Sequence, residues 1–257
     1  MGEVIQQDCL EWMRTQPDNC LDVVVSSPPY NININYNTYA DKRDNYTSWM
    51  RDIWEESFRL LKPTGHLFLN IQPTRENPLM PYEVVSQLSW KVQNTFIWNK
   101  CVEIDGHVRG QGTVANSKRY LPNGWEFVFH LTEKSKTEIS QERSGVPYQP
   151  QWAEDNFKRT GRTWRPSVNS WFVPYETVGH GKISSKKMKG EKKHPAIYPR
   201  ELVRKCLRVA DVQPNMVVYD PFGGTGTTAA VAKEFDCDYI TTEIDTDYVK
   251  FIKERLQ

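Results

Sequence analysis

The chain has 257 residues, of which 38% are apolar, and this is enough to bury the core of an enzyme. No apolar run reaches the ~20 residues of a membrane span, and the N-terminus lacks the basic and then apolar layout of a secretory signal, so a soluble cytoplasmic protein is expected. The net charge of +1 excludes a uniformly basic or acidic chain, so any charged partner must be bound by a local cluster.

The N-terminal half predicts strands that alternate with a helix. Short apolar or β-branched runs indicate strands at residues 23–27, 67–71, 91–98 and 125–131. Between the first two, apolar residues follow the i, i+3, i+4 spacing of one buried helix face over residues 49–61, with Thr47 as a candidate cap near the start. A turn signal at residues 62–65 ends this helix before the next strand.

The segment 135–193 has no clear period and is rich in Pro, Gly, Ser, Lys and Trp, which predicts an irregular insertion. Residues 134–193 hold 13 Lys or Arg against 6 Asp or Glu. Four aromatic residues lie among these cations: Trp152, Trp164, Trp171 and Phe172. Cations neutralise phosphates and aromatic rings stack on bases, so the mixture suits a nucleic-acid surface. A lysine run by itself is more often a solvated loop, and on composition alone both interpretations stay open.

The C-terminal part returns to regular alternation. Helices are expected at residues 200–210, 227–235 and 248–256, and strands at residues 216–220 and 239–243. Strands that alternate with helices at both ends of the chain predict an α/β sheet domain.

A glycine-rich turn follows the strand at 216–220 and opens the next helix. Glycine lets a ligand approach the backbone closely, and the free amides at a helix start can bind it. Glu243 closes the following strand, 19 positions after Gly224, at about the spacing where a carboxylate meets ribose hydroxyls. This order predicts a site for an adenosine-containing cofactor, although a glycine loop alone is also a common structural turn.

A second motif, Ser27-Pro28-Pro29-Tyr30, comes at the end of the strand at 23–27. An exocyclic base amine is a poor nucleophile because its lone pair is delocalised into the ring. The Ser27 hydroxyl and the Pro28 carbonyl can both accept hydrogen bonds from such an amine and favour a pyramidal nitrogen. The ring of Tyr30 offers a face for a base extruded from the duplex. Taken alone, the motif is equally a rigid turn.

Together these motifs resemble the amino-methyltransferase family of DNA-modifying enzymes, in the permuted beta-type order in which the catalytic segment comes first. The family's catalytic motif, Asp, Asn or Ser followed by Pro-Pro and an aromatic residue, is matched by residues 27–30. The resemblance implies a Rossmann-like, mostly parallel seven-stranded α/β sheet with helices on both faces, formed by residues 1–134 and 194–257. It also implies S-adenosylmethionine as the cofactor.

The resemblance implies which residues bind that cofactor. The family's loop Asp-Pro-Phe-x-Gly-x-Gly matches residues 220–226, and its ribose-binding acid falls on Glu243. The acid that reaches the adenine falls on Asp8, although Gln7 replaces the usual Gly before it. The segment that lies against the methionine end falls on residues 193–199. The complete implied set is Asp8, Cys9, His194, Pro195, Asp220, Pro221, Phe222, Gly223, Gly224, Thr225, Gly226, Thr227, Glu243 and Ile244.

The layout has two further consequences. If Asp8 and Glu243 both reach the cofactor, the first strand of the chain must lie beside the last. The segment 135–193 falls where such enzymes have their target-recognition region, which implies double-stranded DNA as the partner. A homodimer and a cognate restriction enzyme are further partners that the resemblance leaves open.

The predicted reaction is direct methyl transfer from S-adenosylmethionine to N4 of cytosine in DNA. In the family resembled here, Ser at the position of Ser27 goes mostly with cytosine and Asp mostly with adenine. N6 of adenine is therefore the alternative. Less favoured are a methyltransferase of RNA or protein, an NAD-dependent oxidoreductase, and a catalytically silent DNA-binding protein of the same fold.

The cysteines argue against methylation of carbon 5 of cytosine. That reaction needs a cysteine nucleophile, usually after a proline, and no cysteine of this chain follows one. The cysteines are odd in number and have no CxxC pair, so neither a disulfide framework nor a metal site is expected. All five are predicted to be packing residues: Cys9, Cys20, Cys101, Cys206 and Cys237.

Overall fold

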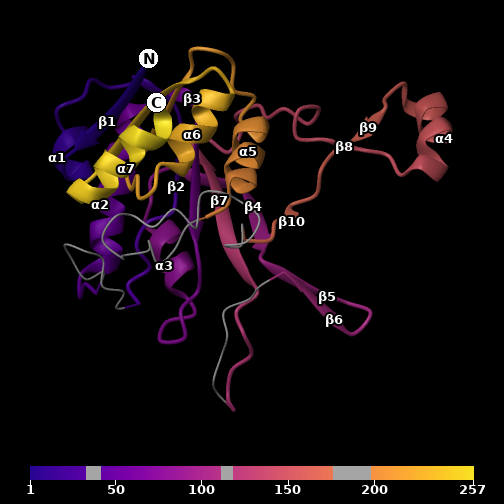
Figure 1. The fold of residues 1–257 in the computed structure, drawn as a ribbon, viewed down its shortest axis with the longest axis horizontal. Helices are drawn as coiled ribbons and strands as arrows, with labels where there is room; N and C mark the ends of the chain where they lie inside the picture. The colour runs from indigo at the N-terminus through magenta and orange to yellow at the C-terminus, as the bar shows by residue number, and fades with distance from the viewer. Residues whose placement is uncertain (33–41, 111–117, 176–197) are drawn as a thin grey trace.

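The computed structural model describes residues 1–32, 42–110, 118–175 and 198–257, and in these residues one mostly parallel sheet is flanked by helices (Figure 1). Within the described residues the sheet has eight strands, in the order β1 (Gly2–Gln6), β12 (Asp238–Glu243), β11 (Val217–Asp220), β2 (Leu21–Ser26), β3 (Leu61–Ile71), β7 (Trp125–Thr132), β4 (Lys91–Asn99) and β10 (Ser170–Phe172). Only β7 runs against its two neighbours, β3 and β4. All other neighbouring strands of this sheet are parallel.

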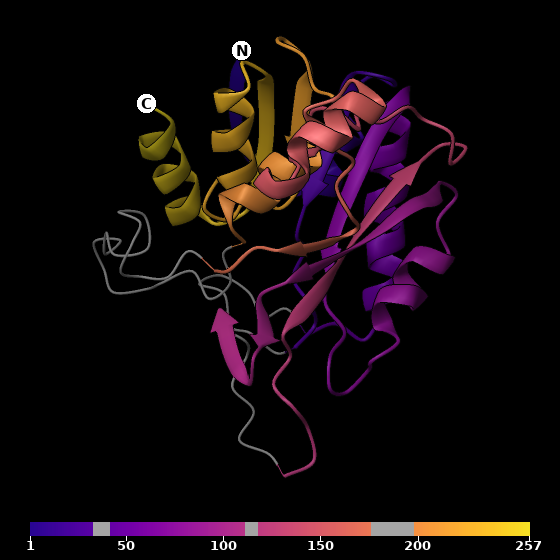
Figure 2. The same cartoon turned by 90° about the vertical axis from the view of Figure 1, so that its right-hand side faces the viewer.

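Helices cover both faces of the sheet, as Figure 2 shows from the side. One face packs against α1 (Cys9–Met13), α2 (Tyr46–Leu60) and α3 (Met80–Ser86), and the other against α5 (Arg200–Val209), α6 (Thr227–Glu234) and α7 (Thr246–Leu256). Successive side chains of a strand point to opposite faces, so β2 supplies Val24 to the first core and Val23 and Val25 to the second. The predicted fold class, a mostly parallel α/β sheet with helices on both faces, is confirmed.

The predicted number of seven strands is wrong by one. The additional strand, β10, lies inside the segment that the sequence predicts to be an irregular insertion, and it pairs in parallel with β4. A strand of three residues is too short to show an alternating pattern. It is held by packing, since the ring of Trp171 stacks on that of Phe96 with centroids 4.2 Å apart.

The turn expected at residues 62–65 is a bulge inside β3 rather than a break before it. Leu21 pairs with Leu61 and Val23 pairs with His66, so the residues between them protrude opposite Asp22. Lys62 Nζ lies 2.6 Å from Asp22 Oδ1 and holds this bulge against β2.

The expected helix cap at Thr47 is also displaced. The N-cap of α2 is Asn45, so Thr47 lies within the first turn of the helix. The strand predicted at 67–71 begins six residues earlier, at Leu61, because the bulge belongs to it. The other predicted helices and strands agree with the structure to within three residues at each end.

The first strand lies beside the last, as the sequence predicts. β1 and β12 pair in parallel, and Gln6 stands opposite Glu243. Figure 1 shows the N- and C-termini close together as a consequence. Segments from the two ends of the sequence therefore meet at one edge of the sheet.

Two structures project from this body. β5 (Cys101–Ile104) and β6 (His107–Gly110) form a hairpin. β8 (Val146–Pro147), α4 (Pro150–Thr160) and β9 (Trp164–Arg165) form a small lobe, here called the α4 lobe, which Figure 1 shows apart from the sheet. None of the residues of α4 is buried, and its Trp152 and Phe157 are more than half exposed.

Three simpler properties follow from the described residues. None of their helices is both long and apolar enough to cross a membrane. No group of three or more His, Cys, Asp or Glu side chains among them is arranged to hold a metal ion. The five cysteines are free thiols, of which Cys9, Cys206 and Cys237 are buried.

Candidate active site

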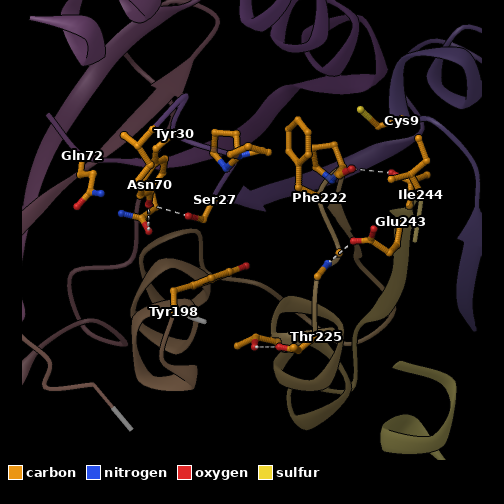
Figure 3. A pocket seen from close by; sticks show the side chains of 18 of the residues that line it. Cys9, Ser27, Tyr30, Asn70, Gln72, Tyr198, Phe222, Thr225, Glu243 and Ile244 are labelled. Atoms are coloured by element: carbon orange, nitrogen blue, oxygen red, sulfur yellow. Dashed lines mark hydrogen bonds between the residues drawn. The ribbon is translucent and has the colours of Figure 1, made fainter. Parts of the chain in front are cut away.

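A cavity of about 330 Å³ lies at the carboxyl ends of the parallel strands. β11 and β2 are neighbours, but the chain continues from β11 to β12 on one side and from β2 to β3 on the other. Such a switch of direction is where open α/β sheets bind ligands. The walls of the cavity come from residues that follow β1, β2, β3, β11 and β12, and from the start of β7; Figure 3 shows them from close by.

One wall brings together the two acids predicted to bind the cofactor. Glu243 accepts hydrogen bonds from the amides of Gly224, at 2.7 Å, and Asp245, at 2.9 Å, each on a different carboxylate oxygen. Burial raises the pKa of Glu243 above its ordinary value. Asp8 Oδ1 accepts from the amides of Leu10 and Glu11 at the start of α1. Both side chains line the cavity, and their oxygens have lone pairs left for hydroxyl or amine donors.

The glycine turn approaches the neighbouring strand and helix so closely that it excludes larger side chains. A Cβ on Gly223 would lie 2.5 Å from Thr241 Oγ1, and a Cβ on Gly226 would lie 2.9 Å from a side-chain carbon of Ile252. Gly224 has φ 51°, in the left-handed region that favours glycine. Its amide is thereby turned toward Glu243 rather than into a helix.

Asp220, predicted to bind the cofactor, is not among the residues that line the cavity. It is 1% exposed, and one carboxylate oxygen accepts from Ser26 Oγ at 2.6 Å and from the amide of Phe222 at 3.0 Å. The other accepts from Thr228 Oγ1 at 2.8 Å and from the hydroxyl of Tyr198 at 3.2 Å. Burial raises the pKa of Asp220 to about 6, although these four donors act in the opposite direction. Its contacts are those of a side chain that holds the loop in place.

The opposite wall contains the predicted catalytic motif. Ser27, Pro28, Pro29 and Tyr30 all line the cavity, directly after β2. The Pro29 carbonyl accepts from the hydroxyl of Tyr46 at 2.7 Å, whereas no described residue donates a hydrogen bond to the Pro28 carbonyl. Ser27 Oγ lies 2.8 Å from the hydroxyl of Tyr30. The Ser27 hydroxyl and the Pro28 carbonyl are thus two candidate acceptors that belong to adjacent residues of the cavity wall.

Behind this motif lies a group of polar residues that the sequence did not suggest. The hydroxyl of Tyr30 lies 2.8 Å from Glu126 Oε2, and Lys100 Nζ lies 3.0 Å from Glu126 Oε1. Lys100 and Glu126 are both buried. Asn70 also reaches Glu126, at 2.9 Å through its amide nitrogen. The only hint in the sequence was a single carboxylate in the mostly apolar strand predicted at 125–131 and a lysine just after the strand at 91–98.

The remaining predicted residues divide into three groups. Cys9, Pro221, Phe222, Thr225, Thr227 and Ile244 line the cavity with the acids and glycines. Gly226, like Asp220, does not line it. His194 and Pro195 lie outside the described residues. Further lining residues without a role in the sequence analysis include Arg43, Trp49, Gln72, Trp98 and Tyr175.

The cavity fits the predicted cofactor at its adenosine end. Two carboxylates, from Asp8 and Glu243, line this part of the cavity together with Gly223 and Gly224, which have no side chains. Carboxylates accept hydrogen bonds from ribose hydroxyls and from an adenine amine. The ring of Phe222 packs edge-on against that of Trp49, with ring centroids 5.8 Å apart, and both residues line the cavity.

Residues 21–254 match the model of a DNA methylase family that comprises N6 and N4 methyltransferases, and the chain belongs to this family. It is therefore a DNA amino-methyltransferase, as the sequence motifs predict.

Among curated relatives, the chain is 24% identical to the DNA adenine methyltransferase YhdJ of Escherichia coli K12, over 98% of this chain and 82% of YhdJ. Among solved structures, it resembles the cytosine-N4-specific PvuII DNA methyltransferase with a TM-score of 0.75 and 18% identity, covering 100% of this chain and 86% of that one. It also resembles a Thermus thermophilus protein, TTHA0409, described as a putative DNA modification methylase in complex with S-adenosyl-L-methionine, with a TM-score of 0.64 and 20% identity, covering 100% and 93% of the two chains. These structural likenesses confirm the fold.

Asp220 predicts an unusual dependence of stability on pH. Because its folded-state pKa of about 6 lies above the ordinary value of 3.8, the folded protein binds this proton more tightly than the unfolded chain does. Its stabilising contribution is therefore complete below about pH 4 and is lost as the pH rises to about 6. The free energy of unfolding of the wild type, relative to Asp220→Asn, should fall by up to about 3 kcal/mol over this range. Urea denaturation at each pH measures this difference, and a difference that rises with pH would contradict the assignment.

Proposed function

We propose that the protein transfers a methyl group from S-adenosylmethionine to N4 of cytosine in double-stranded DNA. The observation that carries this proposal is one cavity that holds two acceptors for an amine, Ser27 and Pro28, opposite two acids for an adenosine moiety, Asp8 and Glu243. The alternative, an oxidoreductase with a similar glycine loop, has no use for the first pair.

S-adenosylmethionine is the cofactor that the sequence predicts for this family of DNA methylases. When bound, it supplies a methyl group made electrophilic by the positive charge on its sulfur. Glu243 and Asp8 would hold its adenosine end, and the turn at Gly223 and Gly224 gives the close backbone approach that such a ligand needs.

The residues of the opposite wall prepare the acceptor nitrogen. The Ser27 hydroxyl and the Pro28 carbonyl accept hydrogen bonds from the two hydrogens of an amine, which localises the nitrogen lone pair. A positioned amine reacts without a covalent enzyme intermediate, and alignment alone can contribute several kcal/mol, roughly 7 to 11 in well-oriented cases. An amine buried in a duplex cannot reach this wall, so the base must be extruded into the cavity.

The choice of cytosine rests on Ser27. A Ser hydroxyl is neutral and can both donate and accept, whereas an Asp carboxylate in the same place is a charged acceptor. The relative YhdJ is named as an adenine methyltransferase, and N6 of adenine is the second candidate product. Both bases present an amine beside a ring nitrogen, so identification of the product decides between them.

The α4 lobe, with its neighbours in the segment 135–193, is the proposed target-recognition region. It has an exposed aromatic pair, Trp152 and Phe157, and exposed cations at Arg159, Arg162 and Arg165. Arg162 lies over the ring of Trp164, 5.1 Å from its centroid, which presents a flat cationic surface. Cations of this kind bind phosphates, and exposed rings bind bases. The five lysines at 186–193 that the sequence adds to this charge lie outside the described residues. A homodimer and a cognate restriction enzyme stay predictions.

The cofactor assignment predicts a selective loss of binding in Gly224→Val. A β-branched residue is strained at φ 51°, and the shift would move the amide away from Glu243. The dissociation constant for S-adenosylmethionine, measured by calorimetry, should rise at least ~10-fold, which is about 1.4 kcal/mol. Gly161→Val is the matched control, because Gly161 has φ 68° at the end of α4 and no atom near its Cβ position. Equal affinities of both variants would reject the loop as the cofactor site.

The recognition proposal predicts a change in salt dependence. Arg159→Gln with Arg162→Gln should weaken DNA binding and lower the slope of log affinity against log salt by up to about 1.8, since each phosphate contact contributes ~0.9. The control pair is Lys250→Gln with Lys253→Gln on the exposed side of α7, which removes the same charge far from the lobe. If both pairs change the slope equally, the lobe makes no specific phosphate contacts.

The proposed product is N4-methylcytosine. Duplex DNA methylated with labelled cofactor should, after digestion to nucleosides, give labelled N4-methyldeoxycytidine as the main product by mass spectrometry. Ser27→Ala should reduce this label while its affinity for S-adenosylmethionine is unchanged. Recovery of N6-methyldeoxyadenosine would overturn the choice of base and keep the amino-methyltransferase, whereas label on carbon 5 of cytosine would overturn both.

A further inference from the structure

The buried ion pair of Lys100 and Glu126 connects to the Ser27 hydroxyl through a single residue, Tyr30. Lys100 Nζ lies 3.0 Å from Glu126 Oε1, Tyr30 Oη lies 2.8 Å from Glu126 Oε2, and Ser27 Oγ lies 2.8 Å from Tyr30 Oη. Lys100 and Glu126 are buried, and Ser27 is the most exposed member of this chain of contacts. Ser27, Tyr30 and Glu126 all border the cavity. Figure 3 shows Tyr30 and Asn70 side by side, with Ser27 turned toward them.

Asn70 determines the direction of the hydrogen bonds around Tyr30. Its amide nitrogen donates to the backbone carbonyl of Phe127 at 3.0 Å, and because a carbonyl can only accept, the assignment of nitrogen and oxygen in this side chain is determined. The same nitrogen donates to Glu126 at 2.9 Å. The amide oxygen of Asn70 therefore faces the hydroxyl of Tyr30, at 3.2 Å.

The hydroxyl of Tyr30 has one proton and three polar neighbours. Two of them, the Glu126 carboxylate and the Asn70 amide oxygen, can only accept. Whichever of these two receives the proton, the oxygen of Tyr30 presents a lone pair to Ser27. The Ser27 hydroxyl must then donate its own proton to Tyr30, and both of its lone pairs are left for the cavity.

The residues around Tyr30 keep its hydroxyl protonated. Burial, followed by the charge of Glu126, raises the pKa of Tyr30 well above its ordinary value, so Tyr30 keeps its proton. Tyr175 approaches the same carboxylate, and its pKa is also raised, first by burial and then by Glu126. Lys100 lies over the ring of Tyr175, 5.8 Å from its centroid, and 3.5 Å from Gln72 Oε1. Among the described residues, Lys100 is the cation that lies within ion-pair distance of Glu126.

We propose that Glu126, held by Lys100, is a positioning residue that directs the proton of Ser27 away from the cavity through Tyr30, so that Ser27 acts only as an acceptor for the base amine. This inference rests on the proposed function in that the substrate is an amine, but it holds for cytosine and adenine alike. It gives Tyr30 a second task besides stacking, and that task belongs to its hydroxyl. A serine without this direction could donate to the ring nitrogen beside the amine and hold the base in an unproductive orientation.

Three variants test the direction of action: Tyr30→Phe, Glu126→Gln and the double variant. Tyr30→Phe keeps the ring and removes the hydroxyl, and in Glu126→Gln the amide can donate to Tyr30 and reverse the chain of hydrogen bonds. Each single variant should lower kcat for DNA methylation ~10- to 100-fold, less than the ~100- to 1000-fold loss of a preorganised group that contacts the reacting atoms directly. KM for DNA and the dissociation constant for S-adenosylmethionine should stay within about twofold. Because Glu126 acts through Tyr30, the double variant should be no slower than the slower single variant.

Two controls separate this role from a structural one. Tyr82→Phe removes a hydroxyl from an exposed tyrosine of α3 and should leave kcat unchanged. Glu126→Gln leaves Lys100 without its partner and can disturb the fold for that reason alone. If Glu126→Gln does not bind S-adenosylmethionine, the variant that combines it with Lys100→Met removes both charges and replaces it in the comparison of single and double variants. Full kcat in Tyr30→Phe, or losses in the double variant that multiply, would overturn the proposal. The base that the wild type methylates tests the proposed function separately. If that base is adenine instead of cytosine, the effects expected of these variants are unchanged.

Discussion

The buried carboxylate of Asp220 holds together the two parts of the chain on which the cavity depends. It ends β11 and accepts a hydrogen bond from Ser26, the last residue of β2, across the switch point of the sheet. The ladder between these two strands has only two residue pairs, so this contact between residues 194 positions apart adds a fixed point just where the strands end. Burial of a carboxylate is unfavourable, and four donors offset part of that cost. As a result, Ser27 and Pro221 begin their loops from one common point.

The two walls of the cavity are brought together by the parallel strands. Each parallel strand delivers its carboxyl end to the same edge, so the short segments after β1, β2, β11 and β12 meet although they are far apart in sequence. The acids and glycines of one wall depend on local backbone geometry. The amine-binding wall depends instead on a polar group buried between strands, where each donor has a fixed acceptor. The first wall is suited to holding the cofactor in one conformation. The second is suited to fixing the orientation of the Ser27 hydroxyl.

The sequence predicted the parts of the site that are formed by residues adjacent in the chain. The Pro-Pro motif and the glycine turn are read from adjacent residues, and both line the cavity where they were expected. Asp220 belongs to the same turn, yet its side chain points into the protein, because a carboxylate beside a strand end can serve either a ligand or a neighbouring strand. Glu126 and Lys100 could not be predicted, since their pairing depends on β7 running against β4, and no local pattern states that direction. The strand β10 was missed for a similar reason, as its three residues form a strand only because β4 offers an edge.

The reversed direction of β7 has a consequence for how such a chain can vary in evolution. Because the register of β7 is set by its ladders with β3 and β4, the connection between Gly110 and Trp125 can gain or lose residues without moving Glu126. An insertion of one residue inside the strand would have the opposite effect, since it would exchange the faces of Glu126 and Phe127 and bring a phenyl ring where the carboxylate lies. We therefore expect changes of length to be tolerated before Gly124, whose carbonyl accepts from the amides of Lys100 and Cys101, and to be excluded from the strand that follows. Chains that differ in length before this strand can then share one arrangement of the amine-binding wall.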